Sequence, residues 1–135
     1  DLKHDVKIFG YTNQIAALMA QASLLVTKPG ALTCTEAAAV GVPSVFYSPI
    51  PGQEEANASY MQEKGCARWV KSQSRLVEAV SELLQHTERL GHMSQACRFC
   101  RRDGAEVVSR GVLQMLEERK QKIYYPSGMT PESIS

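Results

Sequence analysis

Short apolar runs alternate along the chain with longer segments whose apolar residues recur at helical spacing. Apolar runs without polar alternation are typical of strands that are buried on both faces of a sheet. Four segments rich in β-branched, aliphatic and aromatic residues are predicted as strands: residues 6–10, 24–28, 43–49 and 66–70. Six segments are predicted as helices: residues 13–23, 32–41, 53–65, 74–85, 88–100 and 104–122.

This alternation of strands and helices predicts the fold class. Strands separated by helices of 10 to 13 residues form βαβ units, and these units build a parallel sheet covered by helices. We therefore expect an α/β fold with a Rossmann-like, three-layer parallel sheet. One domain is expected over residues 1–122, followed by a mobile tail over 123–135, where turn residues occur without a period.

Composition narrows the classes of function. The chain has 135 residues, 44% of them hydrophobic, and a formal net charge of +1. These values are typical of one globular domain and make nucleic acid a poor candidate partner. The sequence contains no apolar run near the roughly 20 residues that span a bilayer, and no secretory signal opens it.

The four cysteines do not predict a metal site. Cys97 and Cys100 form a C-x-x-C pattern, but Cys34 and Cys66 stand alone. A structural zinc site usually takes four ligands from two such pairs, and the pattern lies in a predicted helix, where it is one ordinary turn. Metal and redox chemistry are therefore disfavoured, and a reducing compartment is expected. No Ser/His/Asp arrangement predicts a nucleophile, so no catalytic residue is assigned.

Polar and glycine residues gather where the strand 24–28 gives way to the next helix. Gly30, Ala31, Leu32 and Thr33 would place backbone N–H groups at a helix start, which suits a diphosphate. The alternative is a simple Pro-Gly turn with Thr33 as a helix cap. Glu36 lies one turn further on, and could either favour the helix dipole or accept hydrogen bonds from a vicinal diol.

A second polar group opens the helix over residues 53–65. Gln53, Glu54 and Asn57 could hydrogen-bond the hydroxyls of a sugar. The alternative is a solvated first turn whose carboxylates favour the helix dipole, and Glu55 is assigned to that role.

Residues 24–67, LLVTKPGALTCTEAAAVGVPSVFYSPIPGQEEANASYMQEKGCA, resemble the donor-binding segment of two-lobed (GT-B) glycosyltransferases of family 28. The loop PIPGQEEANA is most similar to the branch of monogalactosyldiacylglycerol synthases and processive diacylglycerol glucosyltransferases. The resemblance extends upstream to residues 6–12 and, less specifically, downstream to about residue 118. It implies that the fold is a partial C-terminal lobe of a GT-B enzyme.

The resemblance also implies a role for each candidate residue. Tyr11 and Thr12 would line uracil, and Glu36 would hold the ribose hydroxyls. The helix start would face the diphosphate of a UDP-sugar. Gln53, Glu54 and Asn57 would contact the transferred sugar. The implied reaction is inverting transfer of a hexose, galactose or glucose, to diacylglycerol.

Two parts of the family pattern are missing from the sequence. The chain begins after the first two βα units of the lobe, and the N-terminal lobe, which would bind the lipid acceptor and supply the base, is absent. The implied parent is a cytoplasmic enzyme peripheral to the membrane, with no cofactor or metal, and the chain alone is expected to be inactive. Two alternatives stay open: an N-acetylglucosaminyltransferase of cell-wall synthesis, and a non-catalytic nucleotide-binding or assembly module.

The missing βα units raise a question about the sheet. In the family they lie between the strands that correspond to residues 6–10 and 24–28. Unpaired strand edges are costly, so we expect the sheet to close, with Ile8 and Leu25 on neighbouring, hydrogen-bonded strands. The other possibilities are further residues upstream or another molecule in the gap.

Overall fold

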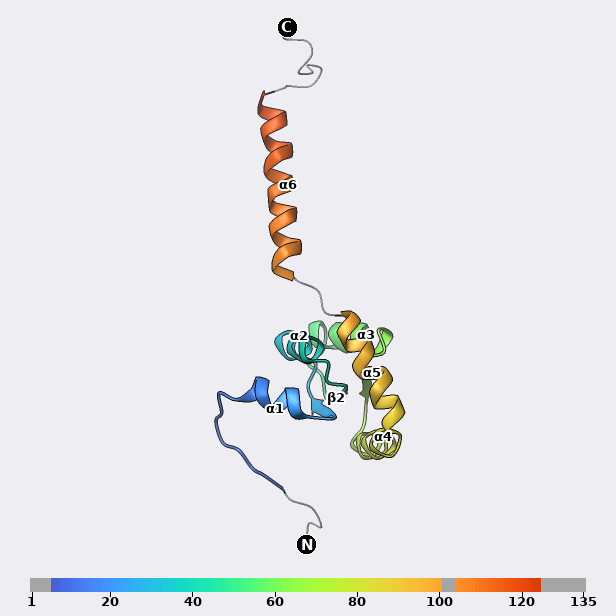
Figure 1. Ribbon diagram of the computed structural model, residues 1–135. Helices are drawn as coiled ribbons and strands as arrows, with labels where there is room; N and C mark the ends of the chain where they lie inside the picture. The colour runs from blue at the N-terminus through green and yellow to red at the C-terminus, as the bar shows by residue number, and fades with distance from the viewer. Residues whose placement is uncertain (1–5, 101–103, 125–135) are drawn as a thin grey trace. The chain divides into compact units, whose positions relative to one another are not determined.

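The computed structural model describes residues 6–100 and 104–124. The chain divides into two compact units, residues 1–101 and 102–135, and each is described by itself. The first unit holds a three-stranded sheet with five helices, and the second holds one long helix (Figure 1). The predicted tail lies outside the described residues, apart from positions 123 and 124.

The sheet is parallel, as the sequence predicts. Its strands are β1 (Leu25–Thr27), β2 (Ser44–Tyr47) and β3 (Ala67–Val70), in the order β1-β2-β3. Val26 of β1 is in register with Val45 of β2. The central strand β2 is the most deeply buried, because strands flank both of its edges, and Val45 and Phe46 are fully buried.

All six predicted helices are present, with small changes at their ends. They are α1 (Ile15–Gln21), α2 (Ala31–Val40), α3 (Gln53–Glu63), α4 (Gln73–Gln85), α5 (Thr87–Cys100) and α6 (Gly104–Tyr124). Gly41 ends α2 with a φ of 80°, and Gly65 follows α3 with a φ of 76°. A left-handed residue just after a helix favours glycine, since glycine has no Cβ to clash.

Helices cover both faces of the sheet. Phe46 packs with residues of α2 and α3 on one face, and Val45 and Val70 pack with α4 on the other. Alternation along β2 therefore sends successive side chains into two separate clusters. The helix α5 contributes Cys97 to the first cluster and Leu90 to the second, so it joins the two layers.

The prediction for residues 6–10 is wrong. This segment forms no strand, and the sheet contains only β1, β2 and β3 within the described residues. The predicted closure against β1 is therefore also wrong. Ile8 is 93% exposed, and Val26 of β1, predicted to be buried, is 47% exposed. β-branched and aromatic residues make a strand only where a partner supplies hydrogen bonds and a surface to pack on.

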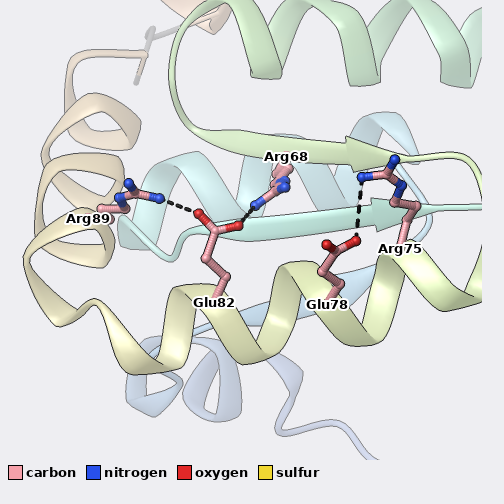
Figure 2. A network of polar contacts seen from close by, with 5 residues as sticks. All are labelled: Arg68, Arg75, Glu78, Glu82 and Arg89. Carbon is pink, nitrogen blue, oxygen red and sulfur yellow. Dashed lines mark hydrogen bonds and ion pairs between the residues drawn. The ribbon is translucent and has the colours of Figure 1, made fainter.

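Ion pairs link β3 to the helices α4 and α5 (Figure 2). Glu82 of α4 accepts a hydrogen bond from Arg68 of β3 at 2.5 Å and pairs through its other oxygen with Arg89 of α5. Hydrogen bonding and charge from Arg68, followed by the charge of Arg89, hold the pKa of Glu82 below its ordinary value. One carboxylate thus ties three elements together.

We expect Glu82→Gln to lower the melting temperature at pH 7, because two arginines lose their shared anion. A carboxylate with a depressed pKa stabilises the fold above its unfolded pKa of about 4.3 and loses this effect as pH falls through the folded pKa. The difference between wild type and Glu82→Gln should therefore shrink below about pH 4 in thermal denaturation. The matched control is Glu78→Gln, because within the described residues Glu78 pairs only with exposed Arg75, at 3.4 Å. Equal losses for the two variants, or a difference that grows on acidification, would contradict this account.

The second unit is the helix α6. Arg110 pairs with Glu106 one turn away, and Gln114 donates to Glu118 at 3.1 Å. Exposed apolar side chains include Val108, Val112, Leu113, Met115 and Leu116. Within residues 6–100 and 104–124, no helix combines the length and the apolar character that crossing a membrane requires.

Candidate functional site

The candidate site lies at the carboxyl ends of the strands. In a parallel sheet these ends share one edge, where ligands of open α/β folds bind. After β1 the chain turns through Pro29 and Gly30 into α2, and after β2 it passes through residues 48–52 into α3. Two helix N-termini therefore open at the same edge of the sheet.

The start of α2 has backbone donors without a side-chain cap. Gly30 is the N-cap residue and no side chain accepts there. The first helical bond of α2 runs from the Cys34 N–H to the Gly30 carbonyl at 2.9 Å. The N–H groups of Ala31, Leu32 and Thr33 thus precede the helical ladder, and such groups bind anions well.

The backbone conformation at position 30 does not require glycine. Its φ of −62° is open to any residue. A Cβ there would lie 3.8 Å from Thr33 Oγ1 and 4.0 Å from Glu54 Oε1, which is ordinary contact. The fold would therefore tolerate a side chain, and its absence keeps the approach to the α2 N-terminus open.

Glu54 holds the loop that leads into α3. Its Oε2 accepts the Ile50 N–H at 2.7 Å, while Oε1 faces the Gly30 side. This hydrogen bond supports a strained loop, because Ser48 has a positive φ of 50°, which is unfavourable for a residue other than glycine. The carboxylate of Glu54 therefore has one oxygen in the loop and one toward the start of α2.

The negative charge of Glu54 also affects the Cys34 thiol of α2. Cys34 is a residue of α2 whose side chain is buried in the core. Burial first, and then the negative charge of Glu54, raise the pKa of the Cys34 thiol to about 11.

Asn57 joins the two helix starts directly. Its Nδ2 donates to the Pro29 carbonyl at 3.0 Å, across 28 residues of sequence. Pro29 is fully buried and Asn57 is half-buried. Since Pro29 immediately precedes the N-cap of α2, this hydrogen bond fixes the position of that helix start relative to α3.

The remaining residues predicted for the site are more exposed to solvent. Glu36 is exposed on α2, and no hydrogen bond to its carboxylate occurs within the described part of the chain. Gln53 is exposed in the first turn of α3, and Leu32 is 80% exposed. Glu55 accepts the Gly52 N–H at 3.2 Å and caps α3, in keeping with its assignment outside the site.

The predicted uracil residues are not joined to this group. Tyr11 is fully exposed. The Thr12 hydroxyl accepts the Gln14 N–H at 3.1 Å, a local bond at the start of α1. Their role stays a prediction.

Two hydrogen-bond partners in the site are not predicted from the sequence: the Ile50 N–H, which donates to Glu54, and the Pro29 carbonyl, which accepts from Asn57. Both are backbone groups, so the residue types at positions 50 and 29 do not indicate their roles.

Comparison with known proteins identifies the family. Residues 1–108 match the glycosyltransferase family 28 C-terminal domain. The chain belongs to this family. The processive diacylglycerol β-glucosyltransferase of Bacillus pumilus is 41% identical over 90 residues, covering 67% of this chain and 24% of that protein. The Bacillus subtilis enzyme of the same name is 32% identical over 123 residues, covering 87% of this chain and 32% of that protein.

Solved structures agree with this membership. The crystal structure of Acinetobacter baumannii MurG matches with a TM-score of 0.60 and 25% identity, over 68% of this chain and 28% of that one. The family resemblance and the α/β GT-B fold expected from the sequence are thus confirmed. The chain spans only about a quarter to a third of the length of these relatives.

Proposed function

We propose that the chain is the UDP-sugar-binding part of an inverting glycosyltransferase that moves a hexose, glucose or galactose, to diacylglycerol. The observation that carries the proposal is the uncapped N-terminus of α2, flanked by Glu54 and fixed by Asn57. The names of the relatives from Bacillus species supply the reaction class.

The α2 N-terminus would take the negative charge of the diphosphate. The N–H groups of Ala31, Leu32 and Thr33 point out of the helix start, and the helix dipole adds to their attraction for an anion. In a displacement reaction, negative charge grows on the diphosphate as the bond to the sugar breaks. Donors already held in place stabilise that charge without reorganising.

The carboxylates and amides would recognise the sugars. Glu36, exposed and without a partner within the described residues, offers two acceptors to the ribose diol. Gln53 and Glu54 would meet hydroxyls of the hexose, with Glu54 using the oxygen that the loop leaves free. Asn57 would act chiefly by holding the Pro29 turn, and its Oδ1 remains available to the donor. Tyr11 and Thr12 would meet uracil.

The acceptor would bind to a second, N-terminal lobe, for which the greater length of the relatives leaves room. Diacylglycerol is a membrane lipid, so the parent enzyme would work as a peripheral protein on the cytoplasmic face of the membrane. The general base would come from that second lobe, because a base must lie within hydrogen-bond reach of the acceptor hydroxyl. We expect residues 1–135 alone to give no turnover with UDP-glucose or UDP-galactose and diacylglycerol.

A second candidate is transfer of N-acetylglucosamine in cell-wall synthesis, which the structural likeness to MurG favours. The two candidates predict different donors. Glu54 is an acceptor with no hydrogen to donate when ionised, so it suits a sugar that presents free hydroxyls to it.

Calorimetry and donor competition test the proposal. The full-length protein should bind UDP and should transfer hexose from UDP-glucose or UDP-galactose to diacylglycerol in vesicles, with inversion at the anomeric carbon. Preference for UDP-N-acetylglucosamine would support the second candidate instead. Absence of UDP binding would overturn both, and would favour a non-catalytic module.

A further inference from the structure

Three cysteines from distant parts of the first unit meet at one place. Cys66 lies directly before β3, and Cys97 and Cys100 lie in the last turn of α5. The Sγ atoms of Cys66 and Cys100 are 3.1 Å apart, although 34 positions separate them in the sequence. Both are free thiols.

This cluster lies at the opposite edge of the sheet from the candidate site. Cys97 Sγ contacts the carbonyls of Val42 and Cys66, both at 3.6 Å. These two residues precede β2 and β3, so they mark the amino ends of the strands. Ser94 of α5 donates to the Gly41 carbonyl at 2.7 Å, and this bond holds the helix along the same edge.

We propose that Cys66 and Cys100 are a modification site, a pair of thiols that a hydroperoxide converts into a reversible disulfide between β3 and α5. An Sγ–Sγ distance of 3.1 Å needs to shorten by only about 1 Å to reach the bond length of a disulfide. Cys100 is the last residue of α5, and the ends of helices fray more readily than their interiors.

The two thiols have different parts in the reaction. Cys100 is half-buried, whereas Cys66 is fully buried, so the oxidant meets Cys100 first. Hydrogen peroxide transfers one oxygen to Cys100, giving a sulfenic acid and water. Cys66 sulfur then attacks the Cys100 sulfur, the S–O bond breaks, and hydroxide leaves with the Cys66 proton as a second water. The sum is two thiols and one peroxide giving one disulfide and two waters.

Cys97 is not the partner in this reaction. It is fully buried, and its thiol faces two backbone carbonyls. Burial raises the pKa of Cys97 and of Cys66 alike, so the pairing is assigned on the 3.1 Å contact between the Sγ atoms of Cys66 and Cys100. Burial and the hydrogen bond with Cys100 raise the pKa of Cys66, which lowers its thiolate fraction and slows its attack on the Cys100 sulfenic acid.

Peptide mapping tests the pairing, because trypsin separates all three cysteines. Cleavage at Lys64, Arg68, Arg89, Arg98 and Arg101 puts Cys66 in the peptide GCAR, Cys97 in LGHMSQACR and Cys100 in FCR. The full-length protein is treated with hydrogen peroxide, alkylated under non-reducing conditions and digested. We expect GCAR linked to FCR, and loss of the link after dithiothreitol.

A thermal readout accompanies the mapping. A cross-link that closes a loop of about 34 residues should raise the melting temperature by about 10 °C, and dithiothreitol should reverse this rise. Methionine oxidation is not reversed by dithiothreitol, so it cannot imitate the effect. Cys100→Ser should abolish both the linked peptide and the rise, whereas Cys97→Ala should keep both.

Several results would overturn the proposal. They are a link from GCAR to LGHMSQACR, a link within the C-x-x-C, or no linked peptide after peroxide treatment. The mapping of the unaltered protein decides the question even if a variant fails to fold.

Discussion

Glu36→Ala is expected to weaken binding of UDP-sugars about 10- to 100-fold. The ribose diol would lose its charged hydrogen bonds to Glu36, which contribute about 1.5–3 kcal/mol in total. A free energy of about 1.4 kcal/mol corresponds to a factor of ten in affinity. Glu36 is exposed on α2 and its carboxylate has no partner within the described residues, so the fold itself should lose little. Titration calorimetry with UDP-sugar in the full-length protein measures the effect, and the melting temperature should stay near that of wild type.

The control is Glu55→Gln on α3. Glutamine keeps an oxygen that can accept the Gly52 N–H and so preserves the cap, while the charge is removed. Affinity should be unchanged. If both variants lose affinity equally, general charge rather than diol recognition explains the effect, and the orientation assigned to these helices is wrong.

Asn57→Ala is expected to lower donor affinity about tenfold or more and to lower stability as well. The Pro29 carbonyl, in a fully buried residue, would lose its hydrogen-bond donor, and leaving such a group unpaired costs about 1–3 kcal/mol. The start of α2 would then be held less firmly, and donors that must reorganise stabilise an anion less well. Affinity for UDP and the melting temperature are measured on the same preparation.

Ser59→Ala provides the comparison for Asn57→Ala. Ser59 is also on α3 and donates to Glu63 at 3.2 Å, but this bond is exposed and away from the sheet edge. The serine variant should bind UDP normally. A stability loss in Asn57→Ala with unchanged affinity would mean that Asn57 supports the fold and not the donor site.

The sequence predicts the sheet well where burial dominates. The short run of apolar residues within 43–49 predicts a buried strand, and Val45 and Phe46 of β2 are fully buried. Glycines at 41 and 65 mark the ends of α2 and α3, since a left-handed turn restricts the choice of residue. Residues 6–10 fail because a strand depends on its partner, which local composition cannot supply.

The candidate site is predicted by residue type but not by its connections. Polar residues at helix starts signal the edge of the sheet. The Asn57–Pro29 and Cys66–Cys100 contacts join residues 28 and 34 positions apart, and such pairs arise only when the chain has folded. The same limit explains why the C-x-x-C pattern drew attention to Cys97, whereas the fold places Cys66 beside Cys100.

The two carboxylate oxygens of Glu54 have different surroundings, and this has a consequence for how the protein can evolve. Oε2 serves the loop through the Ile50 N–H, and Oε1 faces the open side near Gly30. A glutamine at this position could still accept the Ile50 N–H through its amide oxygen, while its amino group would present donors where the carboxylate presents an acceptor. In the proposed donor site, one substitution would therefore change the hydrogen bonds offered to the sugar without disrupting the loop. Position 54 of that site is a place where the range of donors would change while the loop keeps its structure.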